Sequence, residues 1–567
     1  MRRRDFLQAI TLSLPPCFYN SYLTPLLRAD QRSSGSEWSA DVLVVGGGLG
    51  GCAAALAAAR VGLRVVLTEE TDWVGGQLTS QAVPPDEHPW IESFGATRSY
   101  RLLRHLVREY YRRNYPLTAA ARAQPHLNPG AGSVSRLCHE PRVALAALYE
   151  MFAPHISGGR LAILLNHRPV AAEALGDHVQ SVTCKNTLDG SLKVLSAKQV
   201  VDATELGDLL PLTGTEFVTG CESQSETGEP RAPSTAQPAN MQAATWCFPV
   251  EYLQDRDFTI DQPSQYEFWK DYVPPLTPAW PGKLFDWTYT HPVSLRPRTL
   301  AFDPAGERSG WWLYRRIASR SNFSAGSYAG SISLVNWPQN DYLLGNFCEV
   351  SAAELAQHRE GARQLSLSLL YWMQTAAPRP DGGTGWPGLR LRPSLVDTPD
   401  GLAKAPYIRE SRRIRALFTV TEQHVSTDAR MEETGQARDE VTSTSFDDSV
   451  GVGSYRIDLH PSTGGDNYID LSSLPFEIPL GALIPRRVEN LLAGAKNLGV
   501  THITNGCYRL HPVEWNIGEA AGALAAFCVQ SNARPREVRA DSKKLRDFQR
   551  RLQTEGVEIK WPKPLPR

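Results

Sequence analysis

The sequence predicts an α/β fold built around a three-layer, Rossmann-like nucleotide-binding domain. Three observations carry this prediction. A strand, a glycine-rich turn, a helix and a second strand follow one another within residues 41–69. Strand-like segments return at 160–208 and, far along the chain, at 490–497. Residues 216–475 break this alternation, so the nucleotide-binding domain is expected to be discontinuous, with an inserted α+β cap or substrate domain.

The glycine-rich turn is the most informative of these elements. Residues 41–45 form a short apolar run that suits a buried parallel strand. Gly46, Gly48 and Gly51 then make a G-x-G-x-x-G pattern in front of an Ala-rich helix at 52–60. The first glycine permits the tight turn, the second lets the backbone approach a pyrophosphate, and the third allows close helix–strand packing.

The second strand completes a dinucleotide-binding unit. Residues 63–67 are apolar, and Glu69 follows 18 residues after Gly51, close to the spacing of the acid that binds ribose hydroxyls. Gly50, in the same turn, faces the phosphates with the helix N-terminus. An acid in place of Arg at the strand end disfavours a 2′-phosphorylated cofactor.

Composition excludes several other classes of protein. Lys and Arg total 59 against 60 Asp and Glu, so the formal net charge of −1 gives no electrostatic reason to expect a nucleic acid partner. No segment approaches the roughly 20 apolar residues of a membrane helix, so we expect no stable membrane span. The nine cysteines are sparse and none lies within three residues of another, so we expect neither a disulfide scaffold nor a metal site.

Residues 1–39 have the features of a leader and linker. Arg3 and Arg4, followed by x-Phe-Leu, resemble a twin-arginine export signal, and residues 9–14 are mildly apolar. We therefore expect the protein to be exported to the periplasm. An ordinary basic leader, which would leave the protein in the cytoplasm, is the alternative.

A second glycine pair makes the nucleotide-binding unit more specific. Gly75, Gly76 and Gln77 follow the acid after a short spacer. This looks like the E-x(4–6)-G-G continuation of flavoproteins with the glutathione-reductase-type FAD fold, which NAD-only dehydrogenases lack. In such proteins the second glycine pair lets the chain cross the FAD near its ribityl and ring end.

Three later segments fit the same resemblance. Residues 200–208 resemble the strand-ending A-T-G motif, with Ala203 and Thr204 in place and Glu205 where the family has Gly. Residues 490–497 resemble the segment that reaches the ribityl chain, where Asn497 stands near the usual Asp. A small-residue helix opening at Trp515 would aim its N-terminus at the flavin pyrimidine edge. The cofactor contacts that the resemblance implies there are those of Asn516, Ile517 and Gly518, and a backbone contact from Val170 to the adenine.

Taken together, the chain resembles the bacterial FAD-dependent oxidoreductase family, whose members often carry the name xanthan lyase. The firm part of the resemblance covers residues 40–80, 160–215 and 480–530. It implies a flavoprotein that binds FAD and moves hydride between a small organic substrate and the flavin. The expected divisions are a leader and linker at 1–39, the FAD-binding domain at 40–215 and 476–535, the inserted domain at 216–475, and a C-terminal tail at 536–567.

Candidate catalytic residues precede the last expected helix. His511 titrates in the useful range and is our first choice of general base, with Glu514 beside it. The guanidinium of Arg509 could bind a carboxylate or an oxyanion through two parallel N–H groups. Arg409, in an R-E-S-R-R segment, could reach the substrate or the flavin. Each of these side chains could instead satisfy loop backbone groups or join an ion-pair network.

The functional hypothesis is thus an FAD-dependent oxidoreductase, either oxidase or dehydrogenase, with a small-molecule substrate. Two alternatives stay open: a non-redox or nucleic-acid-modifying flavoprotein, and a non-catalytic FAD-binding module. No second G-x-G-x-x-G follows a strand, so a separate NAD(P)H domain is not expected. The electron acceptor would be oxygen, a quinone or a carrier protein.

Overall fold

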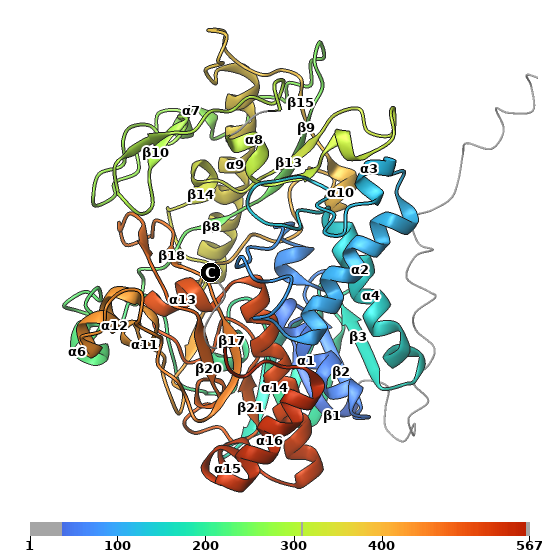
Figure 1. The fold of residues 1–567 in the computed structure, drawn as a ribbon, viewed down its shortest axis with the longest axis vertical. Helices are drawn as coiled ribbons and strands as arrows, with labels where there is room; N and C mark the ends of the chain where they lie inside the picture. The colour runs from blue at the N-terminus through green and yellow to red at the C-terminus, as the bar shows by residue number, and fades with distance from the viewer. Residues whose placement is uncertain (1–36, 308–309, 563–567) are drawn as a thin grey trace, which may run out of the picture.

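The computed structural model describes residues 37–307 and 310–562. The twin-arginine motif falls outside the described residues. Elements from both ends of the described chain lie together in the lower half of the molecule: β1 (Glu37–Val45), β2 (Val65–Glu69) and α1 (Leu49–Arg60), blue in Figure 1, and α14 (His511–Ser531), α15 (Pro535–Ala540) and α16 (Ser542–Glu555), red. Most of the green and yellow elements, from the middle of the chain, lie in the upper half.

A seven-stranded sheet forms the centre of the lower half, and it confirms the predicted α/β, Rossmann-like fold. The order is β3-β2-β1-β6-β5-β4, and β21 also pairs with β6. All the pairs among β1, β2, β3, β6 and β21 are parallel, while β4 and β5 are antiparallel neighbours. The strands are β1 (Glu37–Val45), β2 (Val65–Glu69), β3 (Leu161–Leu165), β4 (His167–Leu175), β5 (His178–Asn186), β6 (Leu192–Asp202) and β21 (Leu491–Ala493).

Strand β6 joins the two distant parts of the nucleotide-binding fold. Its first half pairs with β5, and its last residues pair with β21, with Leu491 beside Val200. From Val194 to Asp202, β6 also runs parallel to β1. A segment near residue 490 therefore completes a sheet that begins at residue 37.

Two helices close the sheet, and glycines let them approach each other. Helix α1 (Leu49–Arg60) packs along α14 (His511–Ser531). A Cβ on Gly518 would lie 1.9 Å from the carbonyl oxygen of Gly50, so only glycine permits this crossing. Helix α4 (Pro141–Ser157) packs on α1 and on α2 (Arg98–Asn114).

A second, antiparallel sheet organises the upper half. Its order is β12-β13-β9-β15, formed by β12 (Arg316–Ala318), β13 (Ile332–Val335), β9 (Phe248–Tyr252) and β15 (Leu389–Leu391). Tryptophans of this half are largely core residues: Trp269, Trp312 and Trp337 are among the largest fully buried side chains. Core packing, rather than pocket lining, accounts for these three residues.

The remaining helices and strands complete the molecule. The helices are α3 (Ala119–Arg122), α5 (Leu209–Leu212), α6 (Gln224–Thr227), α7 (Tyr266–Trp269), α8 (Trp311–Tyr314), α9 (Ala352–Thr375), α10 (Pro393–Val396), α11 (Glu422–Val425), α12 (Thr427–Thr434), α13 (His502–Tyr508), α15 (Pro535–Ala540) and α16 (Ser542–Glu555). Paired strands are β14 (Asp341–Tyr342) with β8 (Ala244–Thr245), β16 (Arg413–Ile414) with β7 (Phe217–Val218), β17 (Ser449–Gly453) with β20 (Phe476–Pro479), β18 (Ile457–Leu459) with β19 (Ile469–Leu471), and β10 (Thr288–Thr290) with β11 (Pro297–Thr299). The 3₁₀ helices are η1 (Gly76–Leu78), η2 (Arg320–Asn322), η3 (Pro338–Asn340) and η4 (Leu480–Leu483).

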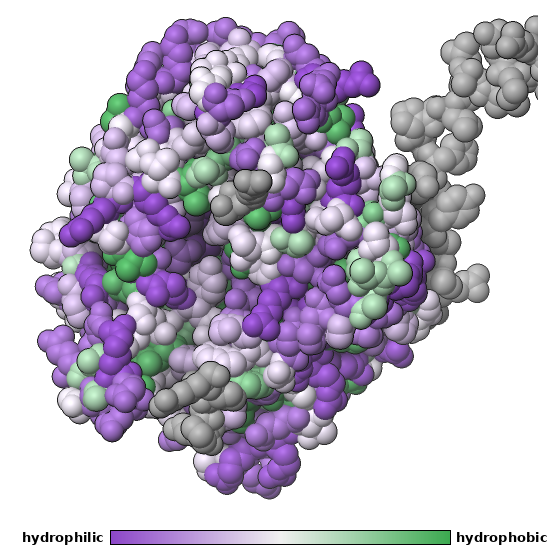
Figure 2. Space-filling view, turned by 45° about the horizontal axis from the view of Figure 1, so that its top comes forward, coloured by the Kyte–Doolittle hydropathy of each residue, from purple (hydrophilic) through white to green (hydrophobic). Residues whose placement is uncertain are grey.

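The surface is mainly hydrophilic, and hydrophobic residues are scattered in small groups on the face that Figure 2 shows. Within residues 37–307 and 310–562, no helix is long and apolar enough to cross a membrane.

Candidate functional site

A cleft opens where the parallel strands end. Strands β1, β2 and β6 lead into Gly46, Glu69 and Ala203, and all three residues line it. Ligands in open α/β sheets bind outside the carboxyl ends of the strands, so this is the expected place for a nucleotide. Measured out to its open mouth, the cleft has a volume of about 850 Å³. Six of the predicted cofactor residues line it: Gly46, Gly48, Glu69, Gly76, Ala203 and Thr204.

Close contacts with neighbouring backbone leave no room for side chains at several positions of the glycine-rich turn. Gly46 has φ +98°, and a Cβ there would lie 2.3 Å from the carbonyl oxygen of Ala203. A Cβ on Gly51 would meet the oxygen of Gly46 at 1.9 Å, and one on Gly50 would meet that of Gly494 at 2.0 Å. Gly46 and Gly48 thus lie on the cleft, while Gly50 and Gly51 let neighbouring backbone approach.

Glu69 stands at the end of β2 with its carboxylate in the cleft. It accepts hydrogen bonds from the Gly47 amide at 2.9 Å and from the amide and hydroxyl of Thr71 at 2.9 and 2.8 Å. Burial raises the pKa of Glu69 to about 7, against the opposing effect of the Thr71 bonds. A carboxyl group in this position can accept hydrogen bonds from ribose hydroxyls.

The second glycine pair lies against the first glycine-rich turn. Gly75 has φ +107°, and its amide donates to the oxygen of Gly47 at 2.7 Å. Gly76 follows on the cleft wall, whereas the Gln77 side chain points away into a buried polar cluster. That side chain donates to the oxygen of Arg509 at 3.0 Å and to the Glu514 carboxylate.

Two charged residues beside the turn were not predicted from the sequence. The buried Lys496 ammonium pairs with Glu205 at 2.5 Å, and Glu205 lines the cleft. Burial lowers the pKa of Lys496, but Glu205 and Glu514 outweigh that effect and raise it, so the lysine stays charged. The sequence feature that could have indicated this ion pair is Glu205, an acid at the position where the family has glycine.

The last helix of the nucleotide-binding fold starts earlier than expected. The prediction that it opens at Trp515 is wrong: α14 begins at His511, after Leu510 as N-cap and with Pro512 in the first turn. The Glu514 amide already donates to the oxygen of Leu510 at 2.8 Å. The backbone N–H groups of Asn516, Ile517 and Gly518 therefore lie beyond the first turn, where the helix uses them itself.

The predicted catalytic residues fall into two groups. Arg509 and Glu514 meet at Gln77, and Arg509 also donates to the Tyr407 hydroxyl at 3.3 Å. Burial is the main cause that raises the pKa of Glu514. Arg409 pairs instead with Asp341 at 3.2 Å, and its guanidinium lies 5.0 Å from the centre of the Tyr407 ring.

His511 is fully buried and does not line the cleft. Its Nδ1 accepts a hydrogen bond from the amide of Asp86 at 3.1 Å, and its Nε2 has no partner among the described residues. Burial, with a contribution from the Arg315 guanidinium, holds the pKa of His511 well below 6.5. The side chain is thus neutral at pH 7.

Three further predicted residues lie near the cleft without lining it. Val170 is on β4, where His167 and Pro169 form the cleft wall instead. Asn497 is buried; it donates to the oxygen of Asp202 at 3.0 Å and so ties the loop after β21 to the end of β6. The side chain of Asn516 donates to the oxygen of Val452 at 3.0 Å, while its own oxygen is buried without a partner among the described residues.

The residues present fit a dinucleotide. A backbone turn free of side chains leads into α1, whose first turn contains no acidic residue. A helix N-terminus of this kind attracts phosphate. Glu69 is placed for ribose, and Lys404 and Arg359 add positive charge to the cleft wall. Trp246 and Ile408, from outside the nucleotide-binding sheet, also line the cleft.

Comparison with known proteins adds a family match. Residues 41–552 match the family described as FAD dependent oxidoreductase. No curated protein matches the chain.

Three solved structures with partial similarity have low TM-scores. A geranylgeranyl bacteriochlorophyll reductase-like protein from Thermoplasma acidophilum is 10% identical, with 92% of this chain and 85% of that chain covered and a TM-score of 0.30. The p-nitrophenol 4-monooxygenase of Pseudomonas putida DLL-E4 is 14% identical, with 68% and 70% covered and a TM-score of 0.29. The L-proline dehydrogenase of P. horikoshii is 16% identical, with a TM-score of 0.17. In that case 34% of this chain is covered, and the chain spans only 26% of the dehydrogenase.

Proposed function

The chain belongs to the family of FAD-dependent oxidoreductases, and on this premise we propose that it transfers hydride between a small organic substrate and FAD held in the cleft. The observation that carries the proposal is the arrangement at the carboxyl edge of the sheet. Gly46, Gly48, Glu69 and Gly76 line one continuous cleft, although they come from separate turns. A glycine-rich turn and an acid at the end of the next strand are the groups that hold the diphosphate and the ribose of a dinucleotide.

Each part of the chain has a distinct role in holding the cofactor. The turn at Gly46 and Gly48 and the N-terminus of α1 would hold the diphosphate, and Glu69 the adenosine ribose. His167 and Pro169 would flank the adenine. When bound, FAD supplies two-electron chemistry that no side chain can provide.

The polar cluster around Gln77 supports the redox proposal. Gln77, Arg509, Glu514 and Tyr407 form a connected hydrogen-bond network behind the second glycine pair. A network of this kind fixes the orientation of its members and excludes water from the substrate end. We propose that Arg509 and Glu514 orient groups there, and that this end of the cleft receives the substrate.

The proposal is tested by the colour and cofactor of the purified protein. We expect a yellow protein that releases FAD, and neither FMN nor NAD, on heating; chromatography of the released cofactor decides this. Glu69→Ala should lower FAD occupancy more than Glu70→Ala, because only Glu69 accepts the Gly47 amide and lies buried at the strand end. Release of FMN, or colourless protein after FAD is supplied, would reject the assignment.

A second assay separates an oxidoreductase from a non-catalytic FAD-binding module. A reductant should bleach the anaerobic holoenzyme, and oxygen, a quinone or a carrier protein should restore its absorbance. Flavin that no acceptor reoxidises would favour the non-catalytic module. The near-neutral net charge argues against the nucleic-acid-modifying alternative.

We also propose export through the twin-arginine route, on the strength of Arg3 and Arg4. That route carries folded proteins, and so suits a chain that must bind FAD before it leaves the cytoplasm. The name xanthan lyase denotes an elimination on a polysaccharide; our proposal is redox chemistry on a small molecule.

A further inference from the structure

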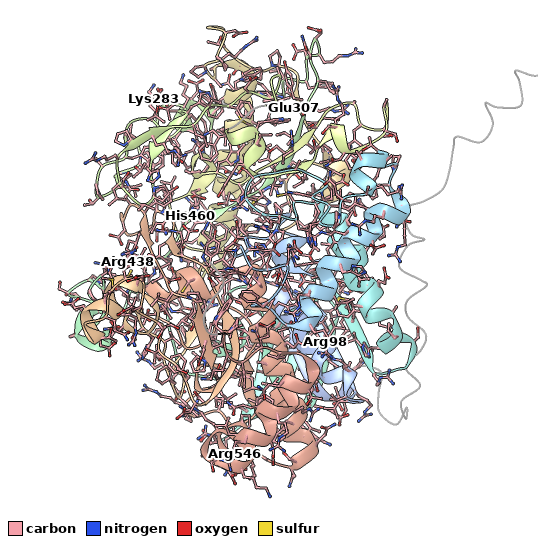
Figure 3. All side chains as sticks on the ribbon, viewed as in Figure 1. Arg98, Lys283, Glu307, Arg438, His460 and Arg546 are labelled. Atoms are coloured by element: carbon pink, nitrogen blue, oxygen red, sulfur yellow. The ribbon has the colours of Figure 1, made fainter. Side chains whose placement is uncertain are left out.

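A histidine–carboxylate pair lies at the junction of the two halves of the molecule. His460 follows β18, and Figure 3 places its label between the upper and lower halves. Its Nδ1 lies 2.6 Å from Oδ2 of Asp341, a buried residue of β14. Asp341 also accepts from the Thr245 hydroxyl and pairs with Arg409 at 3.2 Å.

The hydrogen bonding fixes the protonation pattern of the ring. Burial raises the pKa of Asp341, but Arg409 and His460 outweigh that effect and hold it below its usual range, so the carboxylate is ionised and accepts. Burial and the Arg409 charge together lower the pKa of His460, against the opposing effect of Asp341. A neutral imidazole that donates from Nδ1 to a carboxylate has its lone pair on Nε2.

The free nitrogen of His460 is reachable. The side chain is 19% exposed, and Nε2 makes no hydrogen bond to any residue that the structure describes. Ile457 and Leu459 are buried, whereas Asp458 and His460 are partly exposed, as expected for alternate residues of an extended strand. The Asp458 and His460 side chains therefore face the same open side.

A chain of side-chain contacts joins Asp458 to the polar cluster beside the predicted substrate end of the cleft. Asp458 pairs with Arg509 at 3.4 Å, and Arg509 donates to Tyr407, whose hydroxyl donates to Gln77 at 3.1 Å. A second connection runs through adjacent residues. Ile408 and Trp246 line the cleft; their chain neighbours Arg409 and Thr245 contact Asp341.

From this geometry we infer that His460, oriented by Asp341, is the base that takes the hydroxyl proton of an alcohol substrate. The inference rests on the proposed function, because the reaction needs FAD as the oxidant. The O–H proton would move to Nε2 of His460 as the C–H bond breaks and the C=O bond forms. Bound FAD would supply the two-electron oxidation by accepting the hydrogen of that C–H bond together with its electron pair. Asp341 stabilises the imidazolium that results, as a carboxylate does in a catalytic triad.

An alcohol suits this site better than an amine. A neutral imidazole can accept the hydroxyl proton that must leave as the carbonyl forms, whereas an alkylammonium substrate must lose a proton before its carbon can be oxidised. The charged and titratable groups that face His460 are Asp341, Arg409, Asp458 and Tyr468. Charges of both signs are present, so the site favours no strongly charged substrate.

The first test uses diethyl pyrocarbonate on the holoenzyme at pH 7, read by mass spectrometry. This reagent acylates accessible, unprotonated imidazole nitrogens. We expect the reagent to modify His460. Exposed His105 serves as the positive reference and buried His511 as the negative reference. Asp341→Asn should slow acylation at His460 several-fold, since an amide can donate to Nδ1 and favour the opposite tautomer. An unreactive His460 in the wild-type protein would overturn the inference, whether or not the protein holds FAD.

The second test measures anaerobic flavin bleaching by stopped flow, with a panel of primary and secondary alcohols, polyols and monosaccharides beside matched primary amines. We expect an alcohol to bleach the wild-type enzyme, and His460→Asn to slow that step by about 10²–10⁴-fold with FAD content unchanged. The loss should shrink at high pH, where the alcohol ionises more readily without a base. His105→Asn, on an exposed face of α2, should match wild type.

The outcomes separate the two claims. Bleaching by amines alone, or unchanged bleaching in His460→Asn, would overturn the inference and leave the proposed function standing. A protein without FAD would overturn the proposed function, while the acylation experiment would still report on His460.

Discussion

Glu69 shows how a single buried carboxyl group couples cofactor binding to pH. Its folded pKa of about 7 lies above the ordinary value of 4.5 because burial disfavours the charged form. A raised carboxyl pKa contributes stability that is fully present below pH 4.5 and is lost as the pH rises through 7. Ribose hydroxyls would supply hydrogen bonds to the ionised form and so offset that loss.

We therefore expect the FAD-free protein to lose stability between pH 4.5 and pH 7, and Glu69→Gln to lose less over the same range. The difference between the two proteins should be of the order of 3 kcal/mol, since one pKa unit corresponds to about 1.4 kcal/mol. Thermal unfolding followed by circular dichroism at each pH measures it. Glu70→Gln, which changes a half-exposed side chain, should show the same dependence of stability on pH as the wild-type protein. Parallel pH profiles for wild type and Glu69→Gln would contradict the expectation.

Lys496 is the buried cation beside the phosphate turn. Lys496→Met should weaken FAD binding by about 10- to 100-fold, because it leaves Glu205 and Glu514 uncompensated where the diphosphate is expected. Adding Glu205→Gln should restore part of the affinity, which a titration of FAD fluorescence would show. A double variant that binds more weakly than the single one would mean that Glu205 itself contacts the cofactor.

Prediction from the sequence succeeded best where local chemistry decides the structure. Gly46 and Gly48 turn the chain at the end of β1, and Glu69 ends β2, as their spacing indicated. Lys496, Tyr407 and Asp341 were not predicted, because their importance comes from neighbours about 120 to 330 residues away along the chain. A single sequence shows spacing along the chain, and it does not show such contacts.

At the scale of elements, the start of α14 shows how a boundary prediction fails. The small residues from Trp515 to Gly522 indicated a helix, and a helix is present. Pro512 is well suited to the first turn of a helix. However, residues His511–Glu514 lack the small residues that indicated a helix from Trp515 onward. The helix type was predictable from composition, whereas the start of the helix at His511 was not, because no side chain caps it at Leu510.

The crossing of α1 and α14 gives a sharp test of packing. Gly518→Ala places a Cβ 1.9 Å from the oxygen of Gly50, too close for any contact, so the helices must separate. We expect the melting temperature to fall by several degrees, and FAD content to fall with it because α1 begins at the phosphate turn. Gln530→Ala, at the exposed end of the same helix, should change neither. Normal stability in Gly518→Ala would show that the two helices can shift apart at little cost.

At the scale of the whole molecule, the discontinuous fold was predictable and the path of the inserted part was not. The strand patterns at 41–69, 160–202 and 490–497 indicated one sheet, and all three join it. Strand β14 pairs with β8, and β18 pairs with β19. These segments are too short to show a clear alternation of hydrophobic and polar residues. Tertiary packing, rather than local pattern, brings Asp341 to His460.

Export is also a property of the whole chain. Arg3→Lys together with Arg4→Lys should leave the protein in the cytoplasm with FAD still bound, because a receptor reads the paired arginines. Fractionation of cells that express the two forms, with flavin fluorescence of each fraction, measures the change. Unchanged periplasmic yield in the double variant would reject the twin-arginine route.

The pairing of β21 with β6, and of α14 with α1, has a consequence for the order of events on the ribosome. Glu69 and Leu491 are separated by about 420 residues, which take roughly 20 to 80 seconds to synthesise at 5–20 residues per second. For all that time the phosphate turn has emerged from the exit tunnel without the strand and helix that close its sheet. Until then the sheet of the nascent chain is incomplete, and the apolar surfaces of β6 and α1 are exposed. We expect FAD to bind only after α14 has been synthesised. Chaperone protection during translation, and flavin supply after it, should therefore limit the yield of active protein.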